Sequence, residues 1–247
     1  MAFDFFRRVS PHPWIDSVWR FSFHDDGVYR ATPDGCWRLF LLLTPGATPR
    51  VVNVGQRARP VDVPHLAGEQ VVAIAFAGHV HFVDDPTPPT GARVRFLPVH
   101  DGGFDAKGLM LPLPTFENAE AIVAAMQKKR VLRSNDLVAQ VLKGSTDPAP
   151  DRTVQHNFMR TTGITQTDFR LIRRAQEAVR RLKAGGAGAD VAAELGYADQ
   201  PHMIKSIKKI MGCLPSDLEA VHPLRHKTSH VIEIVGFSLG PVCWPII

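Results

Sequence analysis

The sequence predicts an α+β protein, with a β-rich barrel or sandwich followed by an all-α domain that contains two helix-turn-helix motifs. Short β-type runs separated by Pro and Gly fill the N-terminal part, whereas apolar residues at helical spacing dominate residues 165–211. We expect a β-rich domain over residues 1–115, a connector helix over 116–133, the helix-turn-helix domain over 134–221 and an apolar tail over 222–247.

The N-terminal part contains four strand candidates rich in β-branched and apolar residues, at 38–43, 51–54, 71–76 and 93–97. Turn residues such as Gly46 and Gly68 lie between them. Short strands separated in this way are typical of a small barrel or sandwich. Residues 117–130 then predict a helix that connects the domains and can contribute to dimerisation, with one apolar face formed by Ala119, Ile122, Val123 and Met126.

The second helix-turn-helix motif has the clearest local signals. Residues 189–195 predict a short helix, and Gly196 supplies the left-handed residue that ends it. Asp199 is placed to cap the next helix and Pro201 to occupy its first turn. One face of that helix is apolar, formed by Met203, Ile204, Ile207, Ile210 and Met211.

The other faces of this helix carry groups that suit DNA. Amide, imidazole and hydroxyl groups hydrogen-bond base edges, and lysines suit phosphates. These faces hold Gln200, His202, Lys205, Ser206, Lys208 and Lys209. The alternative interpretation is an ordinary amphipathic surface helix, which has the same periodicity.

A looser copy of the motif lies about 40 residues earlier, where residues 152–163 form a polar segment ending at Gly163. Between the copies, residues 165–183 predict one continuous amphipathic helix. It would span roughly 28 Å, close to the ~34 Å between successive major-groove faces of DNA. We therefore expect two reading helices, joined by this helix, to enter neighbouring grooves.

The charge distribution agrees with this interpretation. Residues 1–129 carry 13 basic and 13 acidic residues, whereas residues 130–247 carry 16 basic and 11 acidic ones, so the whole formal charge of +5 lies in the second part. Counterion release from DNA favours such localisation.

Together these residues resemble the AraC/XylS family of transcription regulators, over roughly residues 134–220. The most specific stretches are 172–178, 190–202 and 212–218. The resemblance implies a double helix-turn-helix domain and a cupin-like N-terminal domain for effector binding or dimerisation. It also implies base-reading residues early in each recognition helix, namely Arg152, Gln155, His156, Gln200, His202, Lys205 and Ser206. We add phosphate contacts from Arg160, Arg173, Arg174, Lys208 and Lys209.

The chain departs from the family pattern at four places. Lys205 stands where Arg is frequent, and Ile207 where a core Phe is usual. Residues 143–150 lengthen the turn of the first motif, and the glycine-rich stretch 185–188 predicts that the second motif can swing relative to the linker helix.

Aromatic and guanidinium side chains in the N-terminal part are candidates for an effector pocket, with core and rim positions as the alternative. The candidates are Trp19, Arg20, Arg30, Trp37 and Arg38. His79 and His81 alternate along a strand and Asp85 follows, which suggests a metal site with His65 or His100 as further ligands. No fourth ligand has distinctive spacing, so we predict no metal and no other cofactor.

We therefore expect a regulator without enzymatic activity that binds double-stranded DNA in the cytoplasm. Three scattered cysteines suit a reducing compartment, and neither a signal peptide nor a membrane-spanning apolar run is visible. The expected partners are a small-molecule effector, a second copy of the chain and, for an activator, RNA polymerase. A metal-dependent cupin-type enzyme with an appended helical domain and a non-specific architectural DNA-binding protein are the competing interpretations.

Overall fold

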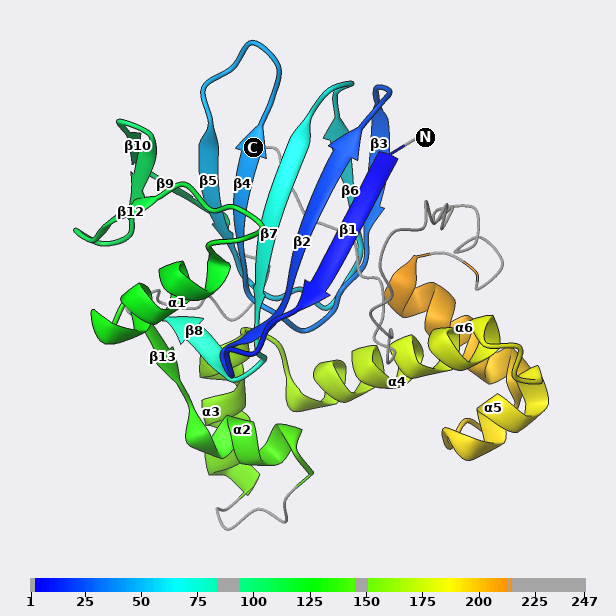
Figure 1. The fold of residues 1–247 in the computed structure, drawn as a ribbon. Helices are drawn as coiled ribbons and strands as arrows, with labels where there is room; N and C mark the ends of the chain where they lie inside the picture. Colours follow the sequence, from blue (N-terminus) through cyan, green and yellow to red (C-terminus); the bar gives the residue numbers. More distant parts are fainter. Residues whose placement is uncertain (1–2, 84–93, 145–150, 213, 215–247) are drawn as a thin grey trace.

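The computed structural model of the protein describes residues 3–83, 94–144, 151–212 and 214. A β-rich N-terminal half precedes a helical C-terminal half, as the sequence predicts (Figure 1). An antiparallel sheet dominates the first half, in the spatial order β1 (Phe3–Val9), β2 (Ile15–Phe23), β7 (Gln70–Phe76), β4 (Arg38–Leu43), β5 (Arg50–Val54) and β9 (Val94–Leu97).

A two-stranded ribbon packs on one face of this sheet and encloses an aromatic core. The ribbon pairs β3 (Gly27–Ala31) with β6 (Val61–His65). Tyr29 of the ribbon approaches Phe21 and Phe23 of β2 with ring centroids 6.2 and 6.3 Å apart. Because aromatic side chains bury large apolar areas, this cluster holds the two layers together as a sandwich.

The opposite face of the sheet is covered by α1 (Ala119–Lys128) and by a short ladder of β8 (Val80–Phe82) and β13 (Leu132–Ser134). The four apolar residues expected on one face of α1 are all buried in this core. That face therefore packs against its own chain, and a dimer interface on α1 would have to use the exposed face. A small sheet of β10 (Val99–His100), β11 (Gly103–Asp105) and β12 (Met110–Pro112) completes this half.

The four predicted strands correspond to β4, β5, β7 and β9, whereas β1, β2, β3 and β6 were not predicted. In β6, Pro64 breaks the expected strand pattern. The ribbon tolerates it because β6 pairs only with β3 among the described strands, so one edge needs no backbone donor.

The helical segments predicted over 152–163, 165–183 and 189–195 are found within one residue of those bounds, and the helix predicted after Asp199 begins at Gln200. The side chains of Asn135, Thr165 and Asp199 accept hydrogen bonds from backbone N–H groups at three helix starts. Gly163 and Gly196 adopt the left-handed conformation that follows a helix end. The helices are α2 (Asp136–Leu142), α3 (Asp151–Thr162), α4 (Gln166–Lys183), α5 (Gly188–Glu194) and α6 (Gln200–Met211).

The glycine-rich stretch between α4 and α5 has a structural explanation that the sequence did not suggest. Gly185 is left-handed, with φ of 87°, and the Gly186 N–H donates to the Arg181 carbonyl at 3.0 Å, which closes the end of α4. A Cβ on Gly186 would lie 2.9 Å from a methyl of Val191. These glycines allow α5 to pack closely on α4, and the predicted swing of the second motif relative to α4 stays a prediction.

Hydrogen bonds also join the helical half to the sheet domain. The Trp37 indole N–H donates to the Thr161 carbonyl at the end of α3, over 3.0 Å. The Gln176 amide donates to the Pro33 carbonyl at 3.2 Å, and Arg30 donates to the Gly212 carbonyl at 3.0 Å. Figure 1 shows α4 running beneath the sheet, between α2–α3 at one end and α5–α6 at the other. The predicted tail 222–247 lies outside the described residues.

Candidate nucleic-acid interface

A short turn that contains several hydrogen bonds positions α6 against α5. Gly196 has φ of 70°, and the next N–H, from Tyr197, donates to the Ala192 carbonyl at 2.9 Å. The Asp199 carboxylate then accepts the His202 backbone N–H at 2.7 Å, which starts α6. This is the helix-turn-helix geometry predicted from the sequence.

The apolar stripe of α6 packs into a core with α4 and α5, which leaves two polar flanks. Met203 and Ile207 are fully buried against Ile172 and Ala175 of α4. The first flank surrounds an open depression of about 510 Å³, lined by Gln200, Pro201, Ile204, Lys205 and Lys208. The second flank holds His202, Ser206 and Lys209. Of the predicted base readers of α6, Gln200 and Lys205 thus line the depression, whereas His202 and Ser206 do not.

His202 lies exposed at the start of the second flank and is oriented by its own turn. Its Nδ1 accepts the Ala198 backbone N–H at 3.3 Å, and its ring meets Tyr197 edge-on with centroids 5.6 Å apart. With Nδ1 as an acceptor, the neutral ring carries its proton on Nε2. His202 can therefore present an N–H donor to a base or phosphate.

Arg174 has an intramolecular role that the phosphate prediction did not include. Its guanidinium lies 4.2 Å from the centre of the Tyr197 ring, and it donates to the Gly196 carbonyl at 3.5 Å. These contacts fasten the turn of the second motif to α4.

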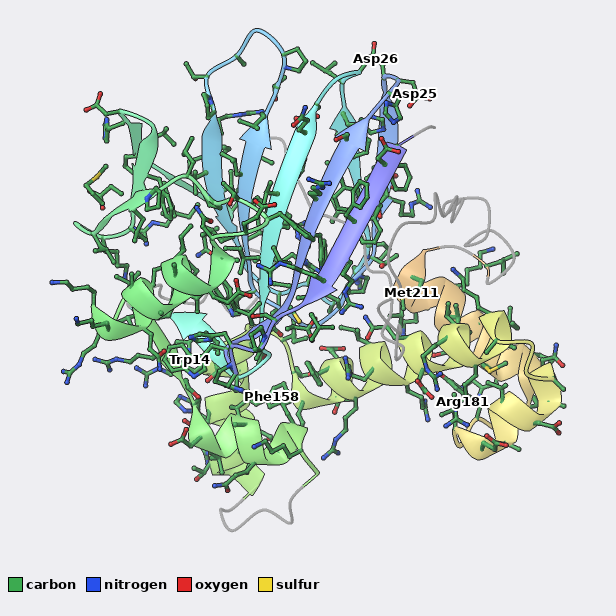
Figure 2. The ribbon with its side chains drawn as sticks, in the orientation of Figure 1. Trp14, Asp25, Asp26, Phe158, Arg181 and Met211 are labelled. Carbon is green, nitrogen blue, oxygen red and sulfur yellow. The ribbon has the colours of Figure 1, made fainter. Side chains whose placement is uncertain are left out.

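In the first motif, the reading residues predicted on α3 lie on its exposed side. Arg152, Gln155 and His156 are exposed, whereas Val154 and Phe158 are buried. Phe158 meets Phe169 of α4 edge-on with ring centroids 5.5 Å apart, and lies near the junction of the two helices (Figure 2). The predicted phosphate residue Arg160 is also exposed. α3 thus has one packed side and one polar side.

Arg173 lies on the stripe of α4 that faces the sheet domain. Phe169 and Gln176, one turn to either side, both contact the turn before β4: a Cβ on Gly35 would lie 2.5 Å from the Phe169 ring. Burial raises the pKa of the Cys36 thiol in that turn, while the nearby Arg173 opposes the rise. Although exposed, Arg173 therefore stands at the border of the domain contact.

The far end of α4 carries a group of cations held by carboxylates. Glu177 accepts from Arg180 at 2.5 and 2.7 Å and from Arg181 at 2.7 Å. The Arg180 hydrogen bond, with help from Arg181, lowers the pKa of Glu177 to about 2. Arg181 also pairs with Glu194 of α5, where α4 and α5 lie side by side (Figure 2). These contacts order the second motif and reduce the positive charge on this part of α4.

The structure separates the five residues predicted to line an effector pocket. Trp19 and Arg38 lie together, with the guanidinium 5.1 Å from the indole ring and paired with Asp34. Arg20 projects to the other face, 4.3 Å from the Phe6 ring, and Trp37 reaches towards α3. Neighbouring residues of a strand point to opposite faces, so the pairs 19/20 and 37/38 do not line one cavity. Arg30 contacts the end of α6 instead.

The histidines considered for a metal site have structural surroundings. His79 bonds the Ser134 hydroxyl at 3.1 Å, and His65 stacks on Phe23. Burial lowers the pKa of His79 and of His81. Asp85 lies outside the described residues. Within the described ranges, no three His, Cys, Asp or Glu side chains gather where they could hold a metal ion.

Sequence reasoning missed two features of the candidate interface and its support. Ile204 was assigned wholly to the packed face, although it is only half-buried and lines the depression. Its spacing of four from both Gln200 and Lys208 could have indicated this position. The contacts of Arg30 and Gln176 between domains had no sequence signal, because their partners are backbone carbonyls distant in the chain.

Comparison with known proteins gives one family match. The model of a helix-turn-helix domain matches residues 149–220. No curated protein sequence matches the chain. No helix among the described residues combines the length and apolar character needed to cross a membrane.

Three similar solved structures are of ToxT from Vibrio cholerae. One is 9% identical and covers 90% of this chain and 100% of that chain, with a TM-score of 0.40. ToxT bound to (E)-4-(8-methylnaphthalen-1-yl)but-3-enoic acid is 9% identical and covers 90% and 99%, with a TM-score of 0.42. Wild-type ToxT bound to an unsaturated fatty acid is 11% identical and covers 87% and 94%, with a TM-score of 0.42.

The family match spans α3 to α6, which include the two helices with exposed polar sides and the α4 helix between them. Residues 149–220 of this chain are therefore a helix-turn-helix DNA-binding domain of the AraC type.

Proposed function

We propose that the protein is a sequence-specific DNA-binding transcription regulator in which α3 and α6 read bases in neighbouring major grooves. The observation that carries this proposal is the pair of exposed polar helix sides at opposite ends of one 18-residue helix, α4. A helix of that length spans about 27 Å, comparable with the ~34 Å repeat of the major groove. No chemical step is needed for this function.

The proposal assigns different tasks to the polar residues of α3 and α6. On α3, Arg152, Gln155 and His156 read bases, and Arg160 binds phosphate. On α6, Gln200, His202, Lys205 and Ser206 read bases, and Lys208 and Lys209 bind phosphate. The side chains of these residues are exposed, except that of Ser206, which is half-buried. Charged phosphate contacts would supply affinity, whereas amide and imidazole groups would supply sequence preference.

In this proposal, the N-terminal domain sets the relative orientation of the two reading helices. This domain contacts both motifs, because Trp37 donates to the Thr161 carbonyl at the end of α3 and Arg30 donates to the Gly212 carbonyl at the end of α6. A small molecule or a second copy of the chain that shifts the sheet domain would change both positions at once. The protein would act in the cytoplasm, recruiting RNA polymerase where it activates transcription.

Selection from a random pool of duplex DNA tests this function. The purified full chain is used at near-physiological salt, beside the Gln155→Ala/Gln200→Ala variant. We expect an enriched sequence with two half-elements about one helical turn apart, and loss of that preference in the variant. Binding without enrichment and with steep salt dependence would instead identify a non-specific architectural protein.

A further inference from the structure

The open depression on α6 differs from an ordinary DNA-facing helix surface because two of its five lining residues, Pro201 and Ile204, are apolar. Pro201 and Ile204 lie between Gln200, Lys205 and Lys208 around it. Ile204 is half-buried, with part of its side chain packed against the core shared by α4, α5 and α6. The rest of this side chain borders the depression, so the core fixes its position from below.

Gln200 borders the depression from one end, with its carboxamide packed on the start of α5. A Cβ on Gly188 would lie 2.6 Å from the Gln200 Cδ and 2.7 Å from its Nε2. Only the missing side chain at position 188 allows the carboxamide to occupy this place. The apolar surface of Pro201 and Ile204 is thus open to a ligand, with Lys205 and Lys208 lining the same depression.

The chemistry of this surface selects among the groups that a base pair shows in the major groove. Adenine and cytosine present amino donors and guanine presents acceptors, whereas only thymine presents a methyl group. Pro201 has no N–H and Ile204 has an apolar side chain, so neither side chain can satisfy a polar base edge. The ammonium group of Lys208 beside this surface suits a neighbouring phosphate.

We propose that this depression receives the C5 methyl group of a thymine, with Ile204 and Pro201 as its contact surface. The inference rests on the proposed DNA-binding function and makes Ile204 a specificity-determining residue of α6. Burial of one methyl group is worth about 0.8 kcal/mol, so removal of that methyl should weaken binding roughly fourfold.

Replacement of thymine by deoxyuridine tests the proposal, because the two bases differ only by this methyl group. Each thymine of the selected duplex is replaced singly, and the affinity of the full chain is measured. We expect one position in the half-element read by α6 to lose roughly fourfold in affinity. In Ile204→Ala, the thymine and deoxyuridine duplexes should bind equally.

Lys208→Ala is the matched control, because Lys208 lines the same depression but is assigned to phosphate. It should bind both duplexes more weakly while keeping their ratio. If part of the Ile204→Ala protein is unfolded, the affinities for the thymine and deoxyuridine duplexes fall by the same factor, so their ratio still reports the preference for the methyl group. Ile204→Val, which shortens the side chain by one carbon, should give a ratio between those of the native chain and Ile204→Ala.

The proposal is overturned if the native chain binds all the deoxyuridine duplexes as well as the thymine duplex, or if Ile204→Ala keeps the preference. Selection of guanine in place of thymine under α6 would also overturn it, while leaving the DNA-binding function intact. A pool with no enriched sequence would overturn both together.

Discussion

Gln200 depends on a single neighbouring residue for its position. Gly188 leaves room for its carboxamide, and an added methyl group would lie 2.6 Å from the Gln200 Cδ. We expect Gly188→Ala to displace the carboxamide and change base preference in the half-element read by α6. The fold should tolerate the change, because the displaced atoms end a flexible side chain and Ala favours a helix over Gly by about 1 kcal/mol. Site selection and a thermal melt measure the two effects.

Gly188→Ala in a Gln200→Ala background is the control, because that background lacks the carboxamide. If Gly188 acts only through the carboxamide, Gly188→Ala should leave the base preference of that background unchanged. A shift of equal size in both backgrounds would show that position 188 acts by another route.

The β8–β13 ladder joins the sheet domain to the first motif and carries two histidines with lowered pKa values. The Asn135 N–H, at the start of α2, donates to the His79 carbonyl at 2.9 Å. Burial lowers the pKa of His81, and Arg160 and Arg133 add to the effect. A histidine that resists protonation when folded stabilises the protein above the unfolded pKa of about 6.5, and this stability is lost as pH falls through that value.

We therefore expect the free energy of unfolding to fall between about pH 7.5 and pH 5.5, with a shallower slope in His81→Gln. Denaturant titrations across this range measure the slope. His100→Gln, which removes an exposed imidazole from the same domain, is the matched control. An unchanged slope in His81→Gln would show that its protonation is not linked to unfolding.

The sheet domain contacts the ends of both helices that we propose read DNA, α3 and α6. Arg30, held by Asp62 at 2.6 and 2.7 Å, donates to the Gly212 carbonyl at the end of α6. Pro60 supports the same end, because a Cβ on Gly212 would lie 2.8 Å from its ring. Trp37 holds the end of α3 from the same domain. The separation of the two reading helices is thus a property of the whole chain.

Without the Arg30 contact, the protein should tolerate a wider range of spacings between the two DNA half-elements. We expect the native chain to lose affinity steeply when the spacing changes by one or two base pairs, and Arg30→Ala to lose less. Affinity across a series of duplexes with altered spacing measures this. Arg20→Ala is the matched control, because it removes an equal charge from β2, where the guanidinium contacts Phe6 rather than α6. Identical spacing profiles for Arg20→Ala and Arg30→Ala would contradict the proposed role of Arg30 in positioning α6.

The helices could be predicted well because their boundaries depend on nearby residues. Asp199 caps α6 through an N–H three residues away, and Gly196 ends its helix by adopting a left-handed conformation. The pocket prediction failed for the opposite reason. Trp37 and Arg38 are adjacent in sequence, yet a strand directs them to opposite faces, and β2 and β3 had not been predicted at all.

The sequence by itself determined the order of domains, the helix-turn-helix motifs and the polar character of the reading helices, since these follow from local capping, periodicity and charge. Only the tertiary structure decided which side chains remain available to DNA. It engages Arg174 with Tyr197, brings Ile204 to the edge of an open depression and fixes Gly212 through Arg30. Those outcomes depend on the packing of residues far apart in the chain, which periodicity along one helix does not encode.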